Sequence, residues 1–385
     1  MVSRNTPSPS TYVLAFFLAL HIALPLYINS SLLATVIQEK YVGLVFTAAS
    51  LIILLAISYF RHILERLGNF LTLQWVMVGE LTALSVFLYT SNPLAIILAM
   101  VAYMVASPLI AFSMDIFLEK TTINKKTGIV RGKYLTATSA GAIAAPFIIS
   151  ILFSGGNYAV IYFTSISILA LVFLMFVCMY GKFEDPKYEK VTFIEAWKAI
   201  RVHHNILRIC SSNFLLYLFY AVMVVYTPIY LSQHIGFSWN SIGQIFTIML
   251  LPFLLLQFPL GWLADKKYGE KEILAIGFAV TALSTGMLTF ITSTNPLVWG
   301  LALLATRVGA SMIEIMNETY FFKKTDSADT PKLMFFTMTR PIGFIVGPAL
   351  ASATFIFFDF PYIFLVTGII LLAGIAVAFK LKDTN

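Results

Sequence analysis

The amino-acid sequence predicts an all-α integral membrane protein with twelve transmembrane helices, arranged as two parallel-repeat six-helix bundles. Three observations lead to this fold class: an apolar composition, a regular series of apolar stretches, and similarity between the two halves of the chain. Hydrophobic residues make up 59% of the 385 positions and charged residues only 11%. Since a soluble domain is about 25% charged, we expect much of this surface to face lipid.

Apolar stretches long enough to cross a bilayer recur along the whole chain. A spanning helix needs about 20 mostly apolar residues, because the hydrocarbon core is about 30 Å thick. The predicted spans are residues 11–33, 41–60, 69–90, 93–115, 133–153, 157–180, 206–232, 240–263, 271–292, 296–320, 333–355 and 359–380. The first span is too long for a signal-peptide core, and no small-residue cleavage site follows it, so we expect it to remain as a helix.

The distribution of positive charge predicts the orientation. If both termini are cytoplasmic, 23 of the 25 Lys and Arg residues fall in cytoplasmic loops or helix ends. Lys40 then lies outside, and Arg307 lies within the bilayer. Because cytoplasmic loops are enriched in Lys and Arg, we predict a multi-pass protein of the cytoplasmic (inner or plasma) membrane with both termini cytoplasmic.

The second half of the sequence repeats short features of the first half at an offset of 200 to 203 residues. The matched features are 42–47 with 242–247, 91–94 with 294–297, and Gly141 and Pro146 with Gly343 and Pro348. An offset that spans six helices preserves orientation, so the repeat is parallel rather than inverted. We therefore predict an N-terminal bundle at 1–180, a cytoplasmic linker at 181–205 and a C-terminal bundle at 206–385.

The linker contains a short amphipathic segment. Phe193, Trp197 and Ile200 share one face of a predicted helix. Lys198 and Arg201 are placed to meet lipid phosphates. We expect this helix to lie on the inner membrane surface as a tether, with membrane lipid as its partner.

One loop carries a recognisable motif. Between the eighth and ninth predicted spans stand Gly261, Asp265, Lys266, Gly269 and Lys271. This spacing resembles the loop motif of the major facilitator superfamily of secondary transporters, as do the two six-helix halves joined by a charged loop. The first-half counterpart at 61–68 keeps a glycine and positive charge but lacks the aspartate. The resemblance covers the whole chain, and it implies the fold of that superfamily and transport by alternating access.

A second motif lies in the fifth span. Gly132, Gly141, Ala145 and Pro146 have the spacing of the superfamily's antiporter motif, with Ala145 replacing a glycine. The resemblance favours exchange or efflux of amphipathic compounds. Arg307 instead indicates anionic or carboxylate-bearing cargo, so uptake, efflux and facilitated diffusion all stay open.

Charged residues at the predicted inner helix ends form a candidate gate. In the resembled fold, such groups cluster beneath the central cavity. The gate candidates are Asp265, Arg131, Glu318, Arg340 and Asp115. A charge cluster is suited to a switch because it is strongly paired when closed and solvated when open. The alternative is a purely structural cluster at the inner helix ends.

The cavity candidates are polar residues away from the helix ends. They are Arg307, Glu314, His21, Asn213, Tyr217 and Gln244. A charge at mid-bilayer costs about 2.5–3.5 kcal/mol, so Arg307 and Glu314 should face protein or water. They are seven positions apart on one helical stripe. We expect Glu314 to carry a coupling proton and Arg307 to contact substrate, or both merely to satisfy polar neighbours. His21 has two open interpretations, a site residue or a packing residue, and Glu80 is expected to be structural.

The sequence contains no constellation typical of an enzyme. We find no nucleophile–base pair, no metal-ligand set and no phosphate-binding loop of the Gly-x4-Gly-Lys-Ser/Thr type. We therefore predict no enzymatic activity, no cofactor, no metal and no nucleic-acid partner. The predicted function is secondary active transport of a small molecule by a monomer, coupled to protons or another ion. The alternatives are a facilitated-diffusion uniporter and a non-transporting receptor or scaffold of the same fold.

Overall fold

The computed structural model describes residues 9–120, 127–153, 156–181, 193–256, 259–260, 269–325 and 330–382. Across these ranges the regular structure is helical and no β-strand occurs. The prediction of an all-α protein is therefore confirmed.

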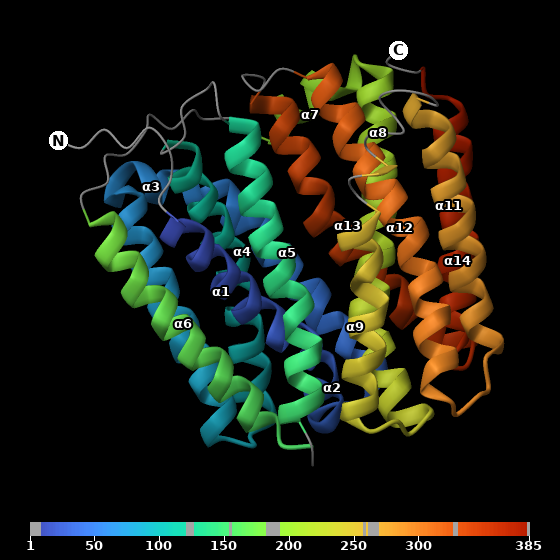
Figure 1. Cartoon of the computed structure of the whole chain (residues 1–385), viewed down its shortest axis with the longest axis horizontal. Helices are drawn as coiled ribbons and strands as arrows, with labels where there is room; N and C mark the ends of the chain where they lie inside the picture. The colour runs from blue at the N-terminus through green and yellow to red at the C-terminus, as the bar shows by residue number, and fades with distance from the viewer. Residues whose placement is uncertain are drawn as a thin grey trace. The chain divides into compact units, whose positions relative to one another are not determined.

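Figure 1 shows the helices in chain order. The described helices are α1 Pro9–Leu26, α2 Asn29–Val36, α3 Glu39–Tyr89, α4 Pro93–Lys120, α5 Thr127–Leu152, α6 Tyr158–Tyr180, α7 Phe193–Arg201, α8 His204–Ile229, η2 Tyr230–His234, α9 Trp239–Leu255, α11 Gly269–Met287, η4 Leu288–Phe290, α12 Pro296–Lys324, α13 Thr330–Phe357 and α14 Tyr362–Phe379. Several helices begin where an Asn or Ser side chain accepts a backbone N–H, as Asn157 does at the start of α6.

Within the described residues, ten helices are long and apolar enough to cross a membrane, and two shorter apolar helices accompany them. Each of the twelve predicted spans corresponds to one of these helices. The first span comprises α1 and α2. The second and third spans run on as α3, and Gly68 between them has φ 75°. Because that left-handed conformation is difficult for residues with a Cβ, glycine is what lets the two spans join without a longer loop.

The chain divides into two compact units. The first comprises Met1–Ile37 and Leu55–Glu189, and in it α1 packs on α5 and α6. The second comprises Gln38–Leu54 and Lys190–Asn385, where α8 packs on α13 and α11 packs on α12 and α14. The α11–α14 pair is seen side by side in Figure 1.

The start of α3 belongs to the second unit through its contacts with α13. Thr47 Oγ1 donates to the carbonyl oxygen of Ile345 at 3.1 Å, and Ser352 Oγ donates to that of Lys40 at 3.0 Å. At the same end of α3, Glu39 Oε2 lies 3.0 Å from His234 Nε2.

Helix α7 packs on other helices more than we expected for a tether that lies on the membrane surface. Ala196 and Ile200 are fully buried, and α7 contacts both α13 and α8. The Trp197 ring lies 5.6 Å from that of Phe335 on α13. The predicted basic face is exposed, as expected, at Lys198 and Arg201. The amphipathic pattern indicated the helix correctly, but its apolar face has a protein partner.

Glycines let helices approach closely in each unit, and one such pair occupies matching positions of the sequence repeat. In the second unit, a Cβ added at Gly343 of α13 would lie 2.7 Å from the backbone of Tyr217 on α8. In the first unit, a Cβ at Gly141 of α5 would meet the backbone of α1 at Phe16 and Leu20. Small residues at such contacts bring helix backbones together in membranes. The contact also places Gly343 of α13 directly beside the backbone of Tyr217 on α8.

Candidate functional site

The central feature of the second unit is a buried aromatic and charged cluster between α8 and α12. The Tyr220 hydroxyl of α8 donates to Glu314 Oε2 of α12 at 2.6 Å. Arg307 lies on the same stripe of α12, seven positions before Glu314. Its guanidinium carbon is 5.0 Å from the ring centre of Phe219 and 5.4 Å from that of Tyr220. Tyr220 therefore contacts both ionisable residues, one through its hydroxyl and the other through its ring.

Arg307 and Glu314 differ in how much of each side chain is exposed to solvent. Arg307 is 4% exposed, whereas Glu314 is half-buried. A guanidinium over aromatic faces is stabilised by the ring quadrupoles, which partly offsets the loss of water. Arg307 thus forms the buried end of the cluster and Glu314 the more accessible end.

A second cation reaches the same cluster from α13. The guanidinium carbon of Arg340 lies 6.0 Å from the ring centre of Tyr217, and Arg340 is exposed. Arg340 and Arg307 are the two cations that act electrostatically on Glu314. The Tyr217 and Tyr220 rings are 5.9 Å apart in an edge-to-face arrangement. The cluster therefore offers one accessible carboxylate, one exposed guanidinium and two tyrosines.

A chain of buried hydrogen bonds holds the three helices of this site together. Ser212 Oγ donates to Asn317 Oδ1 at 2.6 Å, and Asn317 Nδ2 lies 3.4 Å from Asn213 Oδ1. Asn213 Nδ2 in turn donates to Thr339 Oγ1 at 2.8 Å. These bonds link α8, α12 and α13 in sequence, so Asn213 positions helices rather than presenting its amide to an open surface.

The remaining cavity candidates lie elsewhere. Gln244 is exposed on α9, and its amide donates to Asn240 on the same helix at 3.0 Å. His21 lies in the first unit and is completely buried. Its Nε2 is 3.2 Å from Glu80 Oε1, and the same carboxylate oxygen accepts from Ser107. The structure thus joins Arg307, Glu314 and Tyr217 in the second unit, whereas Gln244 bonds within α9 and His21 belongs to the first unit.

The predicted gate residues are described only in part. Asp265 lies outside the described residues, as does the side chain of Arg131. Asp115, Glu318 and Arg340 are exposed. Within the second unit, Glu318 and Arg340 both act electrostatically on Tyr217, so these two belong to one neighbourhood.

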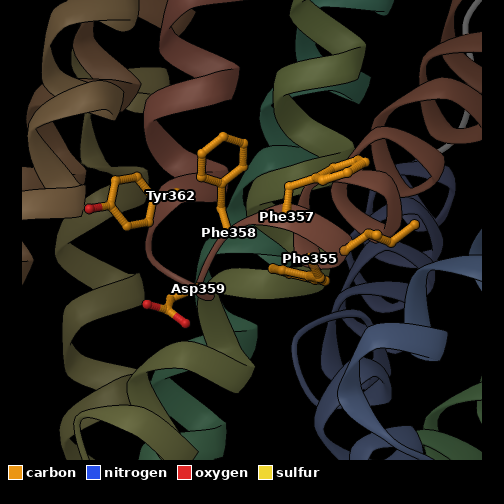
Figure 2. A pocket seen from close by; sticks show the side chains of 6 residues that line it. Phe355, Phe357, Phe358, Asp359 and Tyr362 are labelled. Atoms are coloured by element: carbon orange, nitrogen blue, oxygen red, sulfur yellow. The ribbon is translucent and has the colours of Figure 1, made fainter.

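Two surface pockets lie apart from this cluster. One, of about 410 Å³, is formed at the turn between α13 and α14 by Phe355, Phe357, Phe358, Asp359 and Tyr362 together with Ile356. Figure 2 shows the aromatic side chains around it and the Asp359 carboxylate beside them. Such an aromatic rim is typical of a membrane–water interface. The other pocket, of about 590 Å³, is lined by residues that include His203, Arg208 and Lys382. In the described part of the chain, no group of three His, Cys, Asp or Glu residues is arranged to hold a metal.

Comparison with known proteins identifies the family. The family model of the Major Facilitator Superfamily matches residues 11–326, with a further match over 209–385. The chain belongs to the major facilitator superfamily. The prediction from the loop motif and the repeat is therefore confirmed, and family and fold together indicate a membrane transporter rather than an enzyme.

Solved structures show the same fold. A point-mutant form of the nucleoside transporter NupG aligns with a TM-score of 0.75 and 13% identity, over 96% of this chain and 99% of that one. A further NupG structure aligns with a TM-score of 0.73 and 13% identity, over 97% and 99% of the two chains. Identity this low supports the fold and leaves substrate open. No curated protein sequence matches the chain.

Sequence reasoning missed several members of the site. Phe219, Asn317 and Thr339 were not predicted, although Asn317 follows Glu314 by three positions and so shares its helical face. Phe219 had no detectable signal, because an aromatic residue in an apolar helix is expected at any position. The partner of His21 was also missed, since Glu80 lies 59 residues away.

Proposed function

We propose that this superfamily member is a proton-coupled secondary transporter of a small organic solute, in which Glu314 carries the coupling proton. The observation that supports this most is the hydrogen bond from Tyr220 to the half-buried Glu314, beside two arginines that both act on its charge. The balance between the charged and protonated forms of a carboxyl group depends on its burial, on nearby charges and on its hydrogen bonds. Substrate binding near Glu314 would therefore alter its affinity for a proton, which is the coupling free energy that symport or antiport requires.

Arg307 has a supporting part in this proposal. Arg307 is 4% exposed and its guanidinium lies against the rings of Phe219 and Tyr220, so it supports these rings rather than facing solvent. Arg340, which is exposed beside Tyr217, is the better placed of the two to touch an anionic group on substrate. We still expect Arg307→Ala to weaken substrate binding, because the rings that it supports would lose a fixed position.

Nucleosides are the first substrate class to test. NupG is a nucleoside transporter of the same fold. The Tyr217 and Tyr220 rings provide aromatic surface of the kind on which a planar base packs. Carboxylate-bearing solutes are the second class, since Arg340 and Arg307 are the cations of the cluster.

The first step of the test is a thermal-shift screen of purified protein against nucleosides and organic acids, because a bound ligand stabilises the folded state by mass action. The stabilising compound is then used in proteoliposomes with an imposed proton gradient. Glu314→Gln, which mimics the protonated side chain, should abolish gradient-driven accumulation while exchange across the membrane continues. Glu272→Gln is the matched control, because Glu272 is a half-exposed carboxylate on α11 whose nearest basic partner is Lys271 at 4.0 Å.

Two outcomes would count against the proposal. If Glu314→Gln still concentrates substrate against its gradient, Glu314 does not carry the coupling proton. If the wild-type protein equilibrates substrate without responding to the gradient, the chain is a uniporter. Tyr220→Phe sharpens the result, because it removes only the hydroxyl that donates to Glu314 and should shift the pH dependence of transport while leaving the ring beside Arg307.

A further inference from the structure

A second pair of titratable groups lies in the first unit and has no part in the function proposed above. His21 on α1 and Glu80 on α3 are both 0% exposed, with their closest atoms 3.2 Å apart. Ser107 of α4 and Ser165 of α6 complete the cluster. Four helices of one unit therefore meet at a buried acid and a buried imidazole near the middle of their spans.

The contacts of His21 Nδ1 determine whether that nitrogen carries a proton. Nδ1 lies 3.0 Å from the carbonyl oxygen of Ser165, which only accepts hydrogen bonds. Nδ1 is also 2.8 Å from Ser165 Oγ, whose own hydrogen has an acceptor in the carbonyl oxygen of His21 at 3.1 Å. If Nδ1 were unprotonated, its lone pair would face the Ser165 carbonyl lone pairs. The set of contacts is satisfied together only when Nδ1 carries a proton.

The other side of the ring requires one more proton. Between His21 Nε2 and Glu80 Oε1 a hydrogen must lie on one atom or the other, because two lone pairs at 3.2 Å would repel. Ser107 donates its hydroxyl hydrogen to the same Oε1 and so cannot supply it. The two satisfied forms are imidazolium with carboxylate, and neutral imidazole with carboxylic acid. They are tautomers that contain the same number of protons.

We propose that His21 and Glu80 form a proton-binding site, and that the structure shows this site with its proton bound. A deprotonated pair, neutral imidazole with carboxylate, would leave one buried net charge and would lose the contact between Nδ1 and the Ser165 carbonyl. Such a charge is costly unless it is paired or hydrated. Loss of the proton is therefore linked to a change in the packing of α1 against α3 and α6.

Apart from His21 and the Ser107 hydroxyl, the described surroundings give Glu80 no partner that compensates that charge. Among the described residues, His21 is the basic partner of Glu80, and Glu80 Oε2 has no hydrogen-bond donor. Tyr103 on α4 is the titratable group that acts electrostatically on Glu80, and its hydroxyl is donated to the carbonyl oxygen of Ile22 at 3.2 Å. On α6, the Tyr162 hydroxyl is donated to Asn29. The proton shared by His21 and Glu80 is thus what makes the cluster neutral.

The site can be tested with protons as the only ligand, by ¹⁵N NMR of histidine-labelled protein in detergent at about pH 7.5. The chain has five histidines, and the other four, His62, His203, His204 and His234, are exposed. We expect one histidine whose Nδ1 carries a proton at this pH because of its contact with the Ser165 carbonyl oxygen. Its Nε2 is either protonated, or unprotonated together with an infrared carboxylic-acid band that Glu80→Gln removes.

The signal is assigned by its loss in His21→Gln, or by elimination with His234→Gln and the other exposed positions if His21→Gln does not fold. Glu314→Gln should leave both the histidine signal and the Glu80 band unchanged, so this result is independent of whether Glu314 couples transport. An unprotonated Nδ1 at His21, or a neutral imidazole without an acid band that depends on Glu80, would overturn the proposal.

Discussion

The two units share one pattern of helix packing, α1 on α5 and α6 in the first and α8 on α13 and α14 in the second, and differ in their buried chemistry. Gly141 lets α5 contact the backbone of α1, and Gly343 lets α13 contact the backbone of α8, at positions 202 residues apart in the sequence repeat. The polar groups do not repeat in this way. The first unit encloses His21 and Glu80 at 0% exposure, whereas the second leaves Glu314 half-buried beside Tyr220. The comparison shows that a duplicated scaffold can preserve its backbone contacts while each copy acquires its own ionisable groups.

The largest expected loss of stability comes from removing one member of the buried pair of His21 and Glu80. His21→Leu leaves the Glu80 carboxyl group buried without the imidazole that shares its proton, and removing one partner of a buried ion pair costs about 3–5 kcal/mol. Glu314→Leu should cost less, because the half-buried Glu314 is not enclosed with a single partner. Thermal unfolding in detergent measures both. The double change His21→Leu with Glu80→Leu should recover much of the loss, and equal costs for His21→Leu and Glu314→Leu would remove the distinction between the units.

A smaller effect is expected at the repeated glycines. Gly343→Ala and Gly141→Ala each place a Cβ against the backbone of a neighbouring helix, and overpacking of this kind costs about 1–3 kcal/mol. Gly79→Ala is the matched control, since nothing lies within 4 Å of an added Cβ there. That control should be neutral or stabilising, because alanine is the better helix former by about 1 kcal/mol. A drop in unfolding temperature for only one of the two repeated glycines would show that their roles have diverged.

Breaking the buried hydrogen bonds between α8 and α12 should lower the stability of the protein moderately. Asn317→Ala removes the link between Ser212 and Asn213, and side-chain hydrogen bonds between membrane helices contribute on average about 0.6 kcal/mol each. We expect a loss of roughly 1 kcal/mol from the two bonds. Ser311→Ala serves as the control on the same helix, because its hydroxyl bonds only to Val308 one turn earlier. Equal unfolding temperatures for the two variants would mean that the bonds of Asn317 do not help to hold α12 against α8.

The smallest effect is expected from the ion pair between His234 and Glu39. Both side chains are about one-third exposed, at 33% and 36%. Exposed pairs contribute about 0–1 kcal/mol. His234→Gln should therefore change the unfolding temperature little, in contrast with His21→Leu. A large loss would show that the stacking of His234 against Tyr230 and Phe360 matters more than its charge.

The sequence predicted the helices well because their length and apolar composition are set by the bilayer. Each predicted span has a counterpart, and the stripe of Arg307 and Glu314 on α12 follows from spacing alone. The partners across helices were not predictable. Tyr220 lies 94 residues from Glu314, and Glu80 lies 59 residues from His21. Helices that are apolar on every side give little indication of how each is rotated about its axis.

The linker shows the same division. Its apolar residues Phe193, Trp197 and Ile200 at helical spacing, with Lys198 and Arg201 among them, predicted a helix with one apolar face and one basic face. What covers the apolar face depends on the tertiary structure, because lipid and the side of another helix are both suitable apolar partners. The burial of Ala196 and Ile200 against the second unit decided the question.

The packing of α7 also determines how this chain should be divided for expression as two pieces. A cut after Gly181 leaves Phe193–Arg201 on the same polypeptide as α13, so Ala196, Ile200 and the Trp197–Phe335 contact are all retained by the C-terminal piece. A cut after Val202 assigns the same nine residues to the wrong fragment and uncovers the side of α13. The reassembly of co-expressed fragments should therefore depend on which piece carries α7.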